Sequence, residues 1–302
     1  MTRQHRAQFD AEITFANGGG LRTEGFRLDI PDPDITDDAL ATLLVRHLGL
    51  LMVAEVRISG KTIIEEAHQG GRGVATATGR RRLVELSHLV TDGMTTLPGW
   101  PVPRITDWLT REASRANYAP GVEFHVARID MIANTGTYLD APAHRWADGA
   151  DLAGVPLDRL ADLPGVLVRV PAGTRAVDPL LLAPYEVAGR AVLLHTGWDV
   201  HFGTDRYPAP DAPYLTGAGA QWLVEAGAAL VGIDSINIDD MSPAAAGERP
   251  THSALLAAGI PIVEHLTGLD ALPPTGFRFT AAPPRVAGMG TFPVRAFATI
   301  DD

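Results

Sequence analysis

Three short apolar runs in the second half of the chain constrain its fold most strongly. They are PGVLVRV (164–170), RAVLLHTG (190–197) and AALVGIDSI (228–236). Each is rich in branched side chains and bounded by turn residues, which is typical of buried strands. GAGAQWLVEAG (217–227) and THSALLAAG (251–259) have the pattern of helices, and the glycine that ends the second suits a C-cap. These patterns predict a β-rich α/β domain with a substantial sheet and long, proline-rich loops.

The first part of the chain, residues 1–72, has a different pattern. Alternating runs flank an Asn-Gly turn at residues 17–20, which favours a β-hairpin. Thr36 or Asp37 can cap an amphipathic helix, and residues 53–67 alternate as a second hairpin would. We predict a small α+β N-terminal domain of unknown role over 1–72. A glycine- and arginine-rich linker at 73–82 joins it to the main domain, residues 83–302.

Composition limits the class of protein. Of the 302 residues, 46% are hydrophobic and 20% charged, which indicates a soluble globular protein with a sizeable core. The net charge of -11 argues against nucleic acid or a membrane surface as partner. There is no cysteine, so disulfides, thiolate zinc sites and cysteine nucleophiles are excluded. Because no apolar signal segment or membrane-spanning run is present, we expect a cytoplasmic protein.

The loop NTGTYLDAPAH, residues 134–144, carries the first candidate site. Asp140 and His144 offer an oxygen and a nitrogen ligand for zinc, manganese or a similar divalent ion. By itself the loop is as typical of an Asx turn with a surface histidine. Further on, THSALLAAGIPIVEHL places His252 at a helix start and Glu264 after a short strand. A helix–turn–strand arrangement can bring these two residues to the same end of a sheet, although a capping histidine and a surface glutamate would have the same pattern.

Together these segments resemble the cyclase family of metal-dependent hydrolases, which includes bacterial kynurenine formamidases and isatin hydrolases. The family's loop runs His-x-Gly-Thr-x-x-Asp-x-Pro-x-His, and Gly136, Thr137, Asp140, Pro142 and His144 match it. Further matches in the family's order are ELSHLVTDGMTTLPGWPVP, VLLHTGWD, GIDSINID and HSALLAAGIPIVEHLTGLDALP. The resemblance covers about residues 83–302. It implies a swivelling β/β/α-type domain, here preceded by the small α+β domain, and a homo-oligomer, either a dimer or a tetramer.

The resemblance implies four functional positions: Asp140, His144, His252 and Glu264. Asn134 stands where the family has its first loop histidine, and Tyr138 where a second one often stands, so a binuclear site is not expected. Two arrangements stay open. In the preferred one, the four residues hold one divalent ion, zinc or manganese. In the other, oxygens of Asn134, Asp140 and Glu264 hold a harder ion such as manganese or magnesium, and the two histidines act as acid–base groups.

The predicted activity is metal-dependent hydrolysis of a small cyclic or aryl amide, or of a lactone, by a metal-activated water. His144 or Glu264 would move the proton, and such an enzyme acts on C–N bonds other than peptide bonds. Trp100, Tyr138 and Trp198 are candidates for an aromatic wall around the small-molecule substrate, although each is also typical of core packing. Two alternatives stay open: a cyclase or dehydratase of a polyketide-like substrate, and a non-catalytic small-molecule-binding relative that has lost the full metal site.

Overall fold

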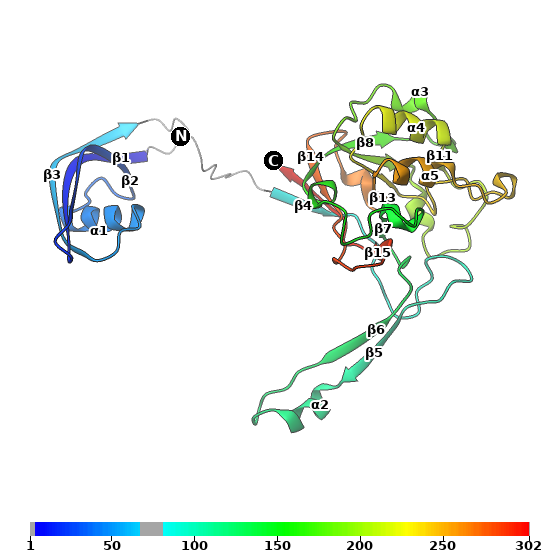
Figure 1. Ribbon diagram of the computed structural model, residues 1–302, viewed down its shortest axis with the longest axis horizontal. Coiled ribbons are helices and arrows are strands. Elements are labelled where there is room, and N and C mark those ends of the chain that lie inside the picture. Colours follow the sequence, from blue (N-terminus) through cyan, green and yellow to red (C-terminus); the bar gives the residue numbers. More distant parts are fainter. Residues whose placement is uncertain (1–3, 67–80, 302) are drawn as a thin grey trace. The chain divides into compact units, whose positions relative to one another are not determined.

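The structure is a computed structural model that describes residues 4–66 and 81–301. It divides into two compact units, Met1–Thr78 and Gly79–Asp302 (Figure 1). Most of the expected linker at 73–82 lies outside the described residues. Its last two residues already belong to a strand, so the regular structure of the second unit begins slightly earlier than the sequence predicts.

The first unit is a three-stranded antiparallel sheet, β1 (Gln4–Phe15), β2 (Gly20–Ile30) and β3 (Val53–Glu66), with helix α1 (Asp37–His47). The Thr36 side chain caps α1 by accepting a hydrogen bond from the backbone of Ala39. The predicted first hairpin and the helix are therefore present. The predicted second hairpin is wrong, because β3 is a single strand that pairs with β1 along its length. Gly60 has φ of +64° and allows a bulge in this strand where the alternation suggested a turn.

The second unit is built on a nine-stranded sheet with the strand order β15-β7-β13-β12-β10-β8-β14-β16-β4. Its centre is parallel: β8 (Leu163–Arg169), β10 (Ala191–His195), β12 (Leu230–Ile233) and β13 (Ile262–Glu264). The outer strands are antiparallel: β7 (Tyr138–Asp140) and β15 (Thr291–Pro293) on one side, and β14 (Phe277–Thr280), β16 (Phe297–Asp301) and β4 (Arg81–Glu85) on the other.

Both faces of the central strands are buried, which explains their uninterrupted apolar runs in the sequence. Val166 and Val168 of β8 belong to one core together with Leu223 of α4 (Gly217–Glu225) and Leu255 of α5 (Pro250–Ala257). Leu167 belongs to the opposite core. A short helix, α3 (Pro179–Leu182), and a two-stranded sheet of β9 (Ala176–Val177) and β11 (Tyr214–Leu215) complete this part. The predicted β-rich α/β fold is confirmed.

A two-stranded arm projects from the second unit (Figure 1). It consists of β5 (Arg104–Leu109), β6 (Val126–Asp130) and, between them, the short helix α2 (Arg111–Ser114). Nearly every residue of both strands is exposed. The arm carries these exposed large apolar side chains: Ile105, Trp108, Tyr118, Val122, Phe124, Val126 and Ile129.

Within residues 4–66 and 81–301, no helix combines the length and the apolar character needed to cross a membrane. The cytoplasmic location stays a prediction.

Candidate metal centre

Strand pairing at one side of the nine-stranded sheet brings the predicted site residues together. In the antiparallel pair of β7 and β13, Asp140 lies opposite Ile262 and Tyr138 lies opposite Glu264. A single turn of 3-10 helix, η2 (Pro142–His144), follows β7 and carries His144, whose Nδ1 lies 3.7 Å from Oδ1 of Asp140. His252 comes from the first turn of α5. Its Nε2 lies 3.7 Å from Oδ2 of Asp140 and 3.7 Å from Oε1 of Glu264.

The four residues differ in their access to solvent. Asp140, His252 and Glu264 are buried, whereas the side chain of His144 is 35% exposed. Asp140, His144 and His252 each present one ligand atom, and these three atoms lie within 4.8 Å of one another. Glu264 extends the cluster from its contact with His252. The centre therefore has an exposed side at His144 and a buried side at Glu264.

Asp140 provides the clearest sign that a cation belongs here. Its Oδ1 accepts a hydrogen bond of 2.5 Å from the hydroxyl of Thr291 on β15. Its Oδ2 is buried and has no hydrogen-bond partner among the described residues. A buried carboxylate oxygen without a hydrogen bond is costly unless a positive charge lies beside it. The imidazole and carboxylate donors around this atom fit a single divalent ion of the zinc or manganese type.

The hydroxyl of Thr291 also fixes which nitrogen of His144 is free. Because this hydroxyl donates its hydrogen bond to Asp140, its oxygen accepts the hydrogen bond of 2.7 Å from Nδ1 of His144. The proton of a neutral His144 is therefore on Nδ1, and Nε2 keeps its lone pair. A free Nε2 on the exposed side of the centre can act as a ligand or as a base.

Asp239 orients His252 in a similar way. Its Oδ2 accepts a hydrogen bond of 2.6 Å from Nδ1 of His252, and its carboxylate also accepts from the backbone N–H groups of Thr251 and His252. A carboxylate behind the second nitrogen is typical of histidines that bind a metal. Sequence reasoning missed Asp239. The segment GIDSINID, which matches the family's pattern, ends in this aspartate, but no residue of the segment was predicted to belong to the site.

The electrostatics of the centre call for positive charge. Burial lowers the pKa of His252, but the nearby Asp140, the hydrogen bond with Asp239 and the charge of Glu264 outweigh it and raise this pKa to about 10. Burial raises the pKa of Glu264 to about 7, although the charge of His252 opposes this shift. The carboxylates therefore hold a proton on His252 strongly, and a divalent ion could provide the same neutralisation.

Tyr138 lies on the buried side of the centre. Its side chain is fully buried, and its hydroxyl donates a hydrogen bond of 2.6 Å to Oε2 of Glu264. Asn134, the other position that departs from the family's pattern, lies beside the Tyr138 hydroxyl. Asn134 is thus close to the centre, next to Tyr138, and its predicted role as a possible oxygen ligand stays a prediction.

Among residues 81–301, no hydrogen bond or ring contact joins Trp198 of the predicted aromatic wall to the four centre residues. Trp198 is half-buried, its indole N–H donates to the backbone of Tyr207, and the Arg206 guanidinium lies 4.6 Å from its ring centroid. Trp100 is 50% exposed, and no hydrogen bond or ring contact among residues 81–301 joins it to the centre. Tyr138 reaches the centre, but through its hydroxyl group. The substrate wall stays a prediction.

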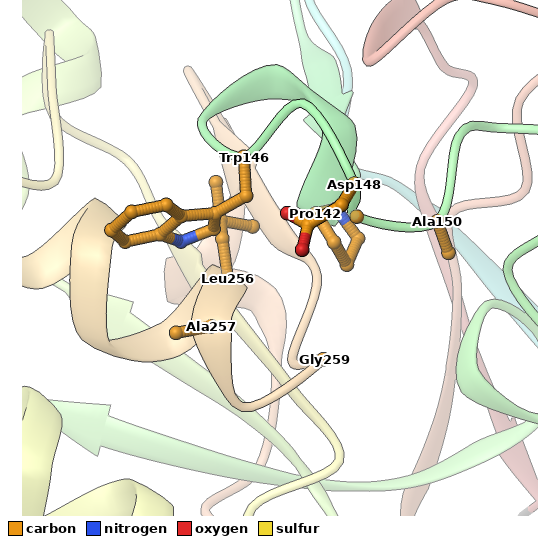
Figure 2. Close-up of a pocket in the computed structure, with 8 residues that line it drawn as sticks. Pro142, Trp146, Asp148, Ala150, Leu256, Ala257 and Gly259 are labelled. Atoms are coloured by element: carbon orange, nitrogen blue, oxygen red, sulfur yellow. The ribbon is translucent and has the colours of Figure 1, made fainter.

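A pocket of about 490 Å³ lies against η2 and the end of α5, beside the centre (Figure 2). Figure 2 shows Trp146 and Leu256 on one side of it and Pro142 with Asp148 on the other. None of the four centre residues lines this pocket. Its lining residues are Pro142, Trp146, Asp148, Gly149, Ala150, Leu256, Ala257 and Gly259.

Comparisons with known proteins agree with this fold. The putative cyclase family matches residues 84–240. A kynurenine formamidase of Salinibacter ruber is 31% identical over 198 residues, which cover 65% of this chain and 89% of the relative. A kynurenine formamidase of Bordetella avium is 28% identical over 219 residues, covering 72% and 97%. Among solved structures, isatin hydrolase A from Ralstonia solanacearum superposes with a TM-score of 0.62 at 23% identity, covering 73% of this chain and 92% of that one.

The fold and the carboxylate–histidine centre define the class of this protein, a metal-dependent hydrolase. Relatives of this class hydrolyse C–N bonds other than peptide bonds. The chain belongs to the putative cyclase family.

Proposed function

We propose that this enzyme hydrolyses the amide bond of a small aryl or cyclic amide, using one divalent ion held by Asp140, His252 and Glu264. The observation that carries the proposal is the buried, unpartnered Oδ2 of Asp140, 3.7 Å from Nε2 of His252. When bound, zinc or manganese supplies a Lewis acid that polarises the carbonyl and makes water a better nucleophile. The kynurenine formamidase relatives support an aryl amide as the substrate class.

His144 is the acid–base group in this proposal. Its exposed position and the free lone pair on Nε2 support this role, because a base must reach the water and the substrate. The hydrogen bond to Thr291 holds the ring while Nε2 takes a proton from water. The same nitrogen then returns the proton to the leaving amide nitrogen, so the base is restored after each turnover. Asp140 and His252, both buried, have no comparable access to a substrate.

Metal content and turnover of two variants test this assignment. We expect the wild type to retain about one ion per chain after dialysis and to hydrolyse aryl formamides or isatin-like lactams with added zinc or manganese. Asp140→Ala should lose the ion. His144→Ala should keep it and lose on the order of 10²–10⁴-fold in kcat. His125→Ala, a histidine on the arm, is the matched control and should change neither.

The other outcomes are equally informative. Loss of the ion from His144→Ala would make His144 a ligand and support the four-ligand arrangement. A folded wild type that binds neither zinc nor manganese would contradict the proposal and favour the non-catalytic binding relative.

A further inference from the structure

The hydroxyl of Tyr138 begins a chain of buried hydrogen bonds that leads away from the centre. The Tyr138 hydroxyl donates to Oε2 of Glu264 at 2.6 Å. Its oxygen is then available to Nε2 of His265, at 3.2 Å. The other nitrogen of His265, Nδ1, lies 2.8 Å from the hydroxyl of Tyr207. Tyr138, His265 and Tyr207 are all buried, so these groups find their partners in one another.

The direction of every bond in this chain is determined. Among the described residues, Nδ1 of His265 is the hydrogen-bond partner of the buried Tyr207 hydroxyl, so this hydroxyl donates to it. The Tyr138 hydroxyl uses its hydrogen in the bond to Glu264. Its oxygen therefore accepts a hydrogen bond from Nε2–H of His265. Nδ1 of His265 then has a lone pair and accepts from the Tyr207 hydroxyl. All three donors therefore point towards Glu264, and bonds aligned in this way polarise one another.

The two oxygens of Glu264 end up in different environments. Oε2 is taken by the Tyr138 hydroxyl. Oε1 accepts the backbone N–H of Ile238 at 2.7 Å and lies 3.7 Å from Nε2 of His252. Only Oε1 therefore faces the atoms that would share an ion with it. The Tyr138 hydroxyl is itself occupied, because it donates to Glu264 and accepts from His265.

We propose that Tyr138, His265 and Tyr207 form a directional hydrogen-bond chain that holds Glu264 as a single-oxygen ligand and limits the centre to one divalent ion per chain. This inference rests on the proposed metal-dependent function. Tyr138 is a positioning residue, because it acts on the ion through Glu264. His265 and Tyr207 act one and two steps further away and strengthen the hydrogen bond that Tyr138 donates.

Zinc affinity, measured by competition with a fluorescent chelator, tests the chain in the full-length protein. Tyr138→Phe should weaken zinc binding about ten- to hundredfold, as removal of a group that orients a ligand commonly does. Tyr207→Phe, further from the ion, should weaken it by less than about tenfold. Tyr185→Phe removes a phenol outside this chain and is the control that should leave zinc affinity unchanged.

A double variant separates a connected chain from independent contacts. Once Tyr138→Phe has broken the chain, adding Tyr207→Phe should weaken zinc binding no further, so the two effects should not multiply. Thermal unfolding of the metal-free proteins provides the second readout, because a merely structural role would lower the unfolding temperature and leave zinc affinity of the folded protein unchanged. Tyr207→Phe keeps the test decisive if Tyr138→Phe does not fold.

Three results would overturn the inference: unchanged zinc affinity in the folded variants, multiplying effects in the double variant, or two ions in the wild type. A wild type that binds one zinc ion and shows the expected variant effects, but hydrolyses no aryl or cyclic amide, would overturn the proposed function and leave this inference standing. A wild type that binds no ion would overturn both.

Discussion

Asp239 shows how much of the centre depends on one side chain outside the four predicted residues. Its carboxylate caps the first turn of α5 through the backbone N–H groups of Thr251 and His252, and it also accepts from Nδ1 of His252. The helix start and the imidazole are therefore fixed by the same group. The geometry of His252 depends on this carboxylate and on the helix it caps.

Asp239→Asn should weaken zinc or manganese binding about ten- to hundredfold, because an amide nitrogen cannot accept from the groups that face it. We also expect a loss of roughly 1–3 kcal/mol in the free energy of unfolding, since a buried donor is left without an acceptor. Chelator competition and urea unfolding measure the two effects. Asp240→Asn, which instead loses its pairing with Arg175, is the control and should leave metal affinity unchanged. Equal metal affinity in Asp239→Asn would show that the helix alone orients His252.

The missing loop histidines permit a direct test of metal number. Asn134→His combined with Tyr138→His should raise the bound metal from one ion towards two per chain, because two nitrogen ligands would be added next to Asp140. Metal analysis of the dialysed protein measures the result. Tyr185→His, which adds an imidazole outside the centre, is the control and should leave the bound metal at one ion. If the double histidine variant gains no metal, the loop backbone, and not these two side chains, sets the number of ions.

At the scale of single residues, the sequence was sufficient to predict the centre residues that lie in motifs of fixed spacing. Asp140, His144, His252 and Glu264 were selected from two segments, and the structure brings all four together. Thr291 and Tyr207 were not selected. Thr291 contacts Asp140 across 151 positions of sequence and Tyr207 contacts His265 across 58, and no local pattern encodes such contacts.

At the scale of elements, burial decided what could be predicted. β8, β10 and β12 are buried on both faces, so their apolar runs identify them. β7 has only three residues and lies inside the segment that was predicted to be a loop. The arm strands β5 and β6 are exposed, and their mixed polar and apolar sequence has no periodicity that a core would impose.

Gly290, just before β15, packs against the backbone of η2 so closely that no larger residue fits there. A Cβ atom on Gly290 would lie 2.4 Å from the backbone nitrogen of His144. Gly290→Ala should therefore displace η2, lower kcat and reduce the free energy of unfolding by about 1–3 kcal/mol. Gly154→Ala is the control, because its nearest contact would be an ordinary 3.4 Å. A Gly290→Ala enzyme with wild-type turnover and stability would show that η2 can shift without moving the His144 side chain.

At the scale of the whole molecule, the arm is exposed within residues 81–301. An isolated two-stranded ribbon is only marginally stable in water, and Trp108 at its surface is 73% exposed. Four arginines and four acidic residues between positions 104 and 130 balance in charge, so two copies of the arm can approach each other without net repulsion between them. The arm also has about the size of one side of a standard protein interface, roughly 20–30 residues. These features favour a second copy of this chain as the partner.

We therefore expect the protein to form a homo-oligomer, a dimer or a tetramer, through the arm. Trp108→Ser combined with Phe124→Ser should shift it to monomers, because buried aromatic side chains contribute most to such interfaces. Light scattering after size-exclusion chromatography measures the mass. Leu89→Ser combined with Leu180→Ser removes two exposed leucines outside the arm and should leave the mass unchanged. A monomeric wild type, or an arm variant that keeps the wild-type mass, would show that the arm has another role. If the arm variant is monomeric and still binds one ion, the metal centre is complete within a single chain, as the contacts among Asp140, His252 and Glu264 lead us to expect.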